Sequence, residues 1–160
     1  MKSMWAPWRM QYIRHSRAPG CFLCAIFKSP PSQDRQNLLL KRGRTCGLVL
    51  NRFPYNGGHL MVAPRRHVAE LQDLRPAEQA ELMRLTATAV AALKKALRPD
   101  GYNIGINLGA AAGAGLRGHL HLHIVPRWTG DTNFMPVLAE VRVVPQALDE
   151  LWVQLAAVLR

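Results

Sequence analysis

The chain has 160 residues, 49% of them hydrophobic and 19% charged, which is the composition of one globular domain with a core of its own. No apolar run reaches the ~20 residues of a membrane span, and residues 1–17 lack the apolar stretch of a signal peptide, so we expect a cytoplasmic protein. The formal net charge of +11 favours an anionic partner, but the basic residues are spread along the chain and do not identify that partner.

The strand candidates are short runs with apolar or alternating character. In chain order they are residues 36–42, 46–52, 59–63, 102–108 and 119–125. The pair Asn56-Gly57 lies between the second and the third of these runs. Because Asn-Gly is the strongest short hairpin signal, residues 46–63 are expected to form a β-hairpin.

Two amphipathic stretches, residues 76–97 and 145–159, are predicted to be helices. Pro76 fits the first turn of the first helix, and apolar residues recur along it at helical spacing. Residues 1–35 carry Trp, Pro and Cys without a clear period and are expected to be irregular. Strands and helices with short connections indicate one α+β domain over residues 1–160, built on an antiparallel sheet of about five strands.

The most informative stretch runs from His119 to Pro126 and alternates histidines with apolar residues. Successive side chains of a strand point to opposite faces, so His119, His121 and His123 are expected to share one face. The apolar residues between them are expected to pack on the core. The alternative is three ordinary strand histidines, but finding three of the chain's six histidines on one face of a seven-residue segment argues against it.

Such a row of imidazoles suits two chemistries. Neutral imidazole is a zinc ligand, and imidazole is also a good nucleophile toward phosphorus near neutral pH. The preceding loop, residues 107–115, is rich in Gly and Ala, so its backbone N–H groups can approach an anion closely. This order of loop and strand favours phosphoryl or nucleotidyl transfer over a site that only binds metal.

The alternating stretch resembles the signature of the histidine triad (HIT) family. The family is also resembled by the sequence Gly58-His59-Leu60-Met61-Val62. Its diadenosine tetraphosphate phosphorylase-like or hydrolase-like branch is resembled by Pro126-Arg127-Trp128 together with Trp5 and Trp8. The resemblance implies a HIT-like fold with two main helices. It also implies a homodimer in which the sheets of two subunits join.

The resemblance further implies a role for each residue of the site. His121 is the nucleophile that attacks the α-phosphate of a dinucleoside polyphosphate and carries the nucleotidyl group, and His123 contacts the phosphate or the leaving group. His59 is expected to orient a histidine or to bond the backbone. The substrate contacts that the resemblance implies are Asn51, Asn107, Gly113, Ala114, Gly115, Arg127 and Trp128.

One departure from the family affects the acceptor of the nucleotidyl group. Many members carry a glutamine or a hydroxyl residue in the phosphate loop, whereas this chain has Ala112-Gly113-Ala114-Gly115 without a side-chain donor. The sequence therefore leaves phosphate and water open as acceptors, which means a phosphorylase or a hydrolase.

Cys21 and Cys24 have the spacing of a zinc knuckle, and a closed tetrahedral site needs two more ligands. His67 and His119 are the candidates, and the resemblance implies both. Such a Cys2His2 site has no open position, so the zinc is expected to be structural and to pin residues 1–35 to the sheet. The alternative is a pair of buried thiols, because a CxxC pair alone is weak evidence.

Two other functions compete with dinucleoside polyphosphate cleavage. A nucleoside phosphoramidate hydrolase would use the same histidines on a different leaving group. A zinc-stabilised basic module that binds nucleic acid would account for the net charge and the CxxC pair. The aromatic fraction of 7%, without aromatic residues interleaved among the basic ones, argues against nucleic acid as the partner.

Overall fold

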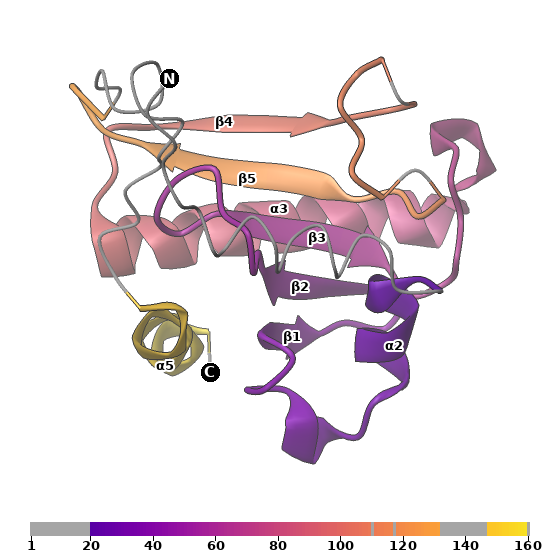
Figure 1. Ribbon diagram of the computed structural model, residues 1–160, viewed down its shortest axis with the longest axis horizontal. Coiled ribbons are helices and arrows are strands. Elements are labelled where there is room, and N and C mark those ends of the chain that lie inside the picture. Colours follow the sequence, from indigo (N-terminus) through magenta and orange to yellow (C-terminus); the bar gives the residue numbers. More distant parts are fainter. Residues whose placement is uncertain (1–19, 110, 117, 132–146, 160) are drawn as a thin grey trace, which may run out of the picture.

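The computed structural model describes residues 20–109, 111–116, 118–131 and 147–159 (Figure 1). In the described part, five antiparallel strands form one sheet in the order β1-β2-β3-β5-β4. The strands are β1 (Leu39–Arg42), β2 (Cys46–Leu50), β3 (Leu60–Pro64), β4 (Gly101–Ile106) and β5 (Leu122–Arg127). The helices are α2 (Phe22–Lys28), α3 (Pro76–Leu97) and α5 (Leu148–Val158), with 3-10 turns at Pro31–Gln33 and Leu71–Asp73. The predicted α+β class and antiparallel sheet are confirmed.

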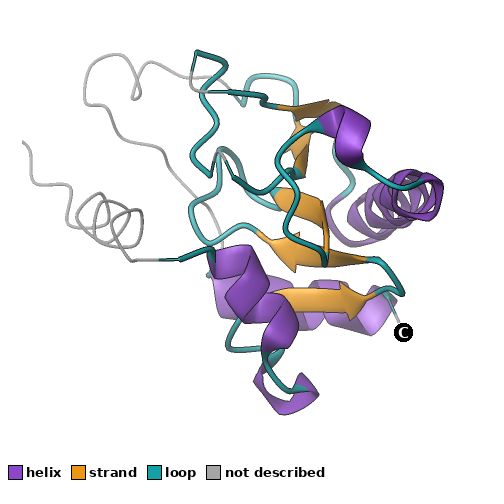
Figure 2. Cartoon of the chain, turned by 90° about the vertical axis from the view of Figure 1, so that its right-hand side faces the viewer, coloured by secondary structure: helices purple, strands orange, loops and turns teal. Residues whose placement is uncertain are grey.

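The long helix α3 lies along one face of the sheet, and Figure 2 shows it to one side of the strands. Its bounds, residues 76–97, agree with the prediction. Leu82, Leu85 and Leu93 point from α3 into the main core, where they pack on the apolar side chains of β2, β3 and β5. No helix in the described ranges is long and apolar enough to cross a membrane.

The β1–β2 turn is tied to α3 by the carboxylate of Glu81, which is only 6% exposed. It accepts hydrogen bonds from the backbone N–H groups of Arg44, Thr45 and Cys46. A Cβ atom on Gly43 would lie 2.7 Å from the backbone oxygen of Cys46 and 2.8 Å from Glu81 Oε1, so the turn needs glycine at this position. Helix, turn and strand are thereby held in one arrangement.

The histidine strand differs from the prediction in its bounds. β5 begins at Leu122 rather than His119 and continues through Pro126 to Arg127. Before Leu122 the chain leaves the ladder, because the backbone N–H of Leu120 donates to Val68 O at 2.7 Å. The side chains still alternate. Leu120, Leu122 and Ile124 belong to the core under α3, while His123 is paired with Met61, whose side chain packs on the opposite face of the sheet.

The N-terminal prediction needs correction, because residues 22–28 form helix α2 and residues 31–33 a 3-10 turn. The usual start signal is missing, since the N-cap residue Cys21 makes no side-chain cap hydrogen bond. Leu23 and Phe27, one helical turn apart, bury against the second face of the sheet. Residues 1–19, including Trp5 and Trp8, lie outside the described residues.

The remaining boundaries differ from the prediction by a few residues at the element ends, which fray into turns. The hairpin of residues 46–63 forms as predicted, from β2 and β3. At one edge of the sheet, α5 covers β1. Trp152 Nε1 donates to Leu39 O at 3.2 Å, and Lys41 Nζ donates to the Leu159 carbonyl at 2.9 Å. Close pairing of another strand with this edge is thus hindered.

Candidate active site and metal centre

The ring of His121 lies on the face of the sheet opposite α3 and is 6% exposed. Its Nδ1 atom is 2.8 Å from the backbone carbonyl oxygen of His119. A carbonyl only accepts, so Nδ1 carries the proton and donates it. In the neutral ring, Nε2 then carries the lone pair, which is the form that attacks an electrophile. Burial lowers the pKa of His121, and the bond to His119 opposes this shift.

His123 and His59 form a buried pair, in which His59 Nε2 is 2.9 Å from His123 Nδ1. The backbone N–H of Tyr55 donates to His59 Nδ1 at 3.1 Å, so this nitrogen is an acceptor. The proton of a neutral His59 is therefore on Nε2, which donates it to His123 Nδ1. The remaining nitrogen of His123, Nε2, then carries the proton of that ring.

The rings of His121 and His123, at the start of β5, meet edge to face. The centroids of His121 and His123 are 4.7 Å apart at an interplanar angle of 75°. Burial, followed by the charge of His121, lowers the pKa of His123 to about 4, so the ring is neutral at pH 7. A neutral ring with a free lone pair on Nε2 therefore stands beside a neutral ring that carries a proton on Nε2, and this pairing could serve nucleophilic displacement at phosphorus.

The expected nucleotide contact Asn51 lies next to His59. Its Nδ2 atom is 3.2 Å from His59 Nδ1, and its Oδ1 atom accepts the backbone N–H of Phe53 at 3.0 Å. The Tyr55 ring lies at 4.7 Å from the His59 ring and is 47% exposed. The structure thus brings Asn51 to the histidine cluster, and it adds Tyr55, which was not among the predicted site residues.

The loop before β5 has an open backbone at its glycines. Gly109 and Gly113 have φ angles of +76° and +81°, a left-handed conformation that glycine adopts without strain. Within the part of the chain that the structure describes, and apart from the adjoining residues, no atom lies within 4 Å of a Cβ built on either of them. Asn107 precedes this loop, and Leu116 anchors its far end in the apolar cluster of α2. Ala114 is buried and Gly115 exposed.

Arg127 and Trp128 are held by Asp131, a residue that was not among the predicted site residues. The Arg127 guanidinium donates to both carboxylate oxygens of Asp131, at 2.7 and 2.6 Å, and the Trp128 backbone N–H donates to the same group at 3.1 Å. The carboxylate also accepts from Asn56 Nδ2 at 2.8 Å. The spacing of four residues between Arg127 and Asp131 was the available signal, but it is common on any surface.

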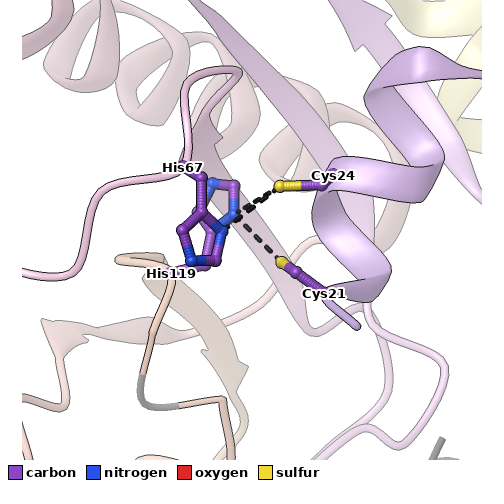
Figure 3. A group of neighbouring side chains, drawn as sticks. All are labelled: Cys21, Cys24, His67 and His119. Atoms are coloured by element: carbon purple, nitrogen blue, oxygen red, sulfur yellow. Dashed lines mark hydrogen bonds between the residues drawn. The ribbon is translucent and has the colours of Figure 1, made fainter. Parts of the chain in front are cut away.

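The predicted metal ligands Cys21, Cys24, His67 and His119 meet beside this site, and their ligand atoms all lie within 4.8 Å of one another. Figure 3 shows the two thiols at the start of α2 facing the two imidazoles. The shortest sulfur–nitrogen separations are 3.1 Å for Cys21–His119 and 3.3 Å for Cys24–His67. A tetrahedral ion bound at ordinary lengths needs sulfur and nitrogen about 3.5 Å apart, so the donor set fits a metal ion.

His119 connects the candidate metal centre to His121. Its Nε2 atom donates to the backbone oxygen of Pro64 at 2.7 Å, so the neutral ring presents the lone pair of Nδ1 to the thiols. The backbone oxygen of the same residue accepts the proton of His121. Both rings of this pair are therefore oriented by main-chain carbonyls.

Comparison with known proteins places these features in one family. The HIT domain model matches residues 34–130. The chain is 42% identical over 154 residues to the AP-4-A phosphorylase of Mycobacterium tuberculosis (strain CDC 1551 / Oshkosh), which covers 92% of this chain and 79% of that protein.

A second relative and a solved structure agree. The asymmetrical bis(5'-nucleosyl)-tetraphosphatase of Schizosaccharomyces pombe is 33% identical over 90 residues, or 56% of this chain and 49% of that protein. The crystal structure of a zinc-bound histidine triad family protein from Mycobacterium smegmatis superposes with a TM-score of 0.68 at 30% identity, covering 90% of this chain and 94% of that one. By sequence and by fold, the chain belongs to the histidine triad family.

Proposed function

We propose that this protein cleaves dinucleoside polyphosphates such as diadenosine tetraphosphate through a nucleotidyl group carried on His121. One observation carries the proposal. The bond from His121 Nδ1 to the His119 carbonyl, at 2.8 Å, leaves the lone pair on Nε2. The identity of 42% to an AP-4-A phosphorylase supports the substrate class.

In the first step, His121 Nε2 attacks the α-phosphorus in line. A P–N bond forms, the bond from phosphorus to the bridging oxygen breaks, and the electron pair of that bond leaves with the departing nucleotide. His123 Nε2–H donates a hydrogen bond to the leaving oxygen, which departs as a phosphate anion and needs no proton.

In the second step, an acceptor oxygen attacks the same phosphorus and the P–N bond breaks, which returns the lone pair to His121. Inorganic phosphate as acceptor gives ADP and ATP from diadenosine tetraphosphate, whereas water gives AMP and ATP. We propose phosphate, on the strength of the phosphorylase relative. Product analysis with and without phosphate tests this: ADP that appears only with phosphate is expected, and AMP formed in water alone would mean a hydrolase.

The substrate contacts form a second part of the proposal. The backbone N–H groups of residues 113–115 and the side chain of Asn107 hold the phosphates, because the loop has space for a close anion. Asn51, beside His59, contacts the ribose. Arg127 and Trp128, which Asp131 fixes, contact the polyphosphate and the second nucleoside.

The metal centre is proposed to hold a structural zinc ion. Two thiolates and two imidazoles are the donor set that zinc takes in closed sites, and they would retain the start of α2 against the sheet. Because such thiols must remain reduced, we place the protein in the cytoplasm. Metal analysis of protein purified without chelator should find about one zinc per chain.

A homodimer joined through β4 is also proposed. In the described part, β4 pairs only with β5 and forms the edge of the sheet, with Ile104 47% exposed. Light scattering during size-exclusion chromatography should give twice the mass of one chain. The substitution Ile104→Lys should shift the mass toward that of a monomer, and a monomeric unmodified protein would rule the dimer out.

A further inference from the structure

The turn between β2 and β3 is fastened to the far end of β5 by one side chain. Asn56 Nδ2 donates to the carboxylate of Asp131 at 2.8 Å and to the backbone oxygen of Pro126 at 3.2 Å. On the turn side, Asn56 Oδ1 accepts the backbone N–H of Gly57 at 3.0 Å. The side chain therefore joins two segments that are 70 and 75 residues apart in sequence.

The aspartate that receives this bond is itself fixed. Its side chain is 11% exposed and forms a bidentate ion pair with Arg127. Arg127 in turn donates to the Asn103 side chain on β4 at 2.9 Å. Bidentate pairs of this kind are geometrically specific, so Asp131 gives Asn56 a defined anchor on the sheet.

The turn that Asn56 holds carries two main-chain groups that bond His59, one at its backbone and one at its ring. The Asn56 carbonyl accepts the backbone N–H of His59 at 3.2 Å. The adjacent residue, Tyr55, donates its backbone N–H to His59 Nδ1 at 3.1 Å. His59 Nδ1 also has the side-chain amide of Asn51 at 3.2 Å, and a displacement of this turn would move the shorter of its two donors, the Tyr55 amide.

We propose that Asn56 is a positioning residue for His123. By fixing the turn between β2 and β3, it holds the Tyr55 amide on His59 Nδ1, which keeps the His59 proton on Nε2 and directed at His123 Nδ1. His123 then keeps its own proton on Nε2, on the side of the reacting group. The effect of Asn56 on the His59–His123 proton does not depend on the proposed function. Only the effect on turnover rests on that function.

The substitution Asn56→Ala in the full-length, metal-loaded protein tests this proposal. Asn37→Ala is the matched control, because Asn37 is also a half-buried turn asparagine whose Nδ2 donates to a side chain, Ser29 Oγ at 2.9 Å. Asn56→Asp is a second variant, since it keeps the size of the side chain, removes the donor and sets a carboxylate against Asp131.

The first readout is the ring proton between His59 and His123, observed by NMR in protein labelled with 15N-histidine. The unmodified protein and the Asn37 control should show this proton on His59 Nε2, protected from exchange with water, and an unprotonated His123 Nδ1. Both Asn56 variants should exchange the proton at least about tenfold faster, because the turn opens more often. Thermal unfolding establishes that each variant is folded.

The second readout is turnover of diadenosine tetraphosphate. The Asn56 variants should lose about tenfold in kcat, with KM changed by less than about twofold, because a donor in the transition state is disturbed. A protected ring proton in both folded Asn56 variants would overturn the proposal, and so would faster exchange with unchanged kcat. If the unmodified protein does not cleave the substrate, the proposed function fails, while the NMR comparison still decides whether Asn56 sets the histidine pair.

Discussion

The carbonyl oxygen of His119 accepts the Nδ1 proton of His121 at 2.8 Å, and the ring of the same His119 lies 3.1 Å from the thiol of Cys21. One residue thus belongs to the candidate metal centre through its side chain and to the candidate active site through its backbone. A change at the four candidate metal ligands should therefore alter the position of the His121 ring.

Replacing a metal ligand should therefore affect both sites. Cys24→Ser should lower the bound zinc well below that of the unmodified protein, lower the unfolding temperature and reduce kcat, because zinc ligation contributes to folding. Metal content and thermal unfolding measure this effect. Cys46→Ser is the control, because Cys46 is buried away from the metal ligands. Equal zinc content in both variants would count against the four-ligand centre.

The buried carboxylate of Glu81 should stabilise the fold. Burial would raise its pKa, but hydrogen bonds from the side chain and backbone of Thr45 and from the amides of Cys46 and Arg44 lower it to about 2. Glu81→Gln should cost about 2 kcal/mol at pH 7, since charge-assisted bonds are lost. Urea unfolding measures the loss, and the exposed Glu70→Gln should change stability by less than about 0.5 kcal/mol.

The same group should produce acid sensitivity. Its pKa in the fold, about 2, lies below the ordinary value of 4.5, so the stabilisation is present above about pH 4.5 and is lost as the pH falls toward 2. Glu81→Gln should therefore flatten the dependence of unfolding free energy on pH in this window. An unchanged pH dependence would contradict the assigned pKa.

The buried His123 should make the free energy of unfolding depend on pH in a higher pH range than Glu81 does. Its pKa is about 4 in the fold against 6.5 ordinarily, so the unfolded chain binds the proton more readily. The contribution of His123 to stability is present above about pH 6.5 and is lost as the pH falls toward 4. The slope of unfolding free energy against pH counts the protons taken up on unfolding, and urea unfolding measures it. His123→Asn should lower this count by up to one between these two pH values. A slope as steep as that of the unmodified protein would oppose this prediction.

The parts of the molecule that follow from local sequence were predicted well. Helix α3 was predicted at its observed bounds because Pro76 starts it and Pro99-Asp100-Gly101 follows it. The hairpin at Asn56-Gly57 formed as expected. The CxxC spacing and the family resemblance predicted four candidate metal ligands, and these residues meet in space.

The contacts that orient the site could not be predicted in the same way. The Tyr55 amide reaches His59 only because of the turn geometry, and the Asn56–Asp131 bond joins segments whose proximity depends on the sheet order. The early end of the β3–β5 ladder depends on the bond from Leu120 to Val68, which no periodicity encodes. Hydrogen bonds to main-chain groups distant in sequence cannot be predicted from the order of residue types along the chain.

Detection of the covalent intermediate tests the central claim most directly. The protein is mixed with excess diadenosine tetraphosphate without phosphate, quenched rapidly at alkaline pH, which preserves a P–N bond, and mapped by peptide mass spectrometry. An adenylyl group on His121 is predicted, and folded His121→Asn should carry none and lose at least about a thousandfold in kcat. An adenylyl group on another residue, or substantial turnover by pure His121→Asn, would contradict the account.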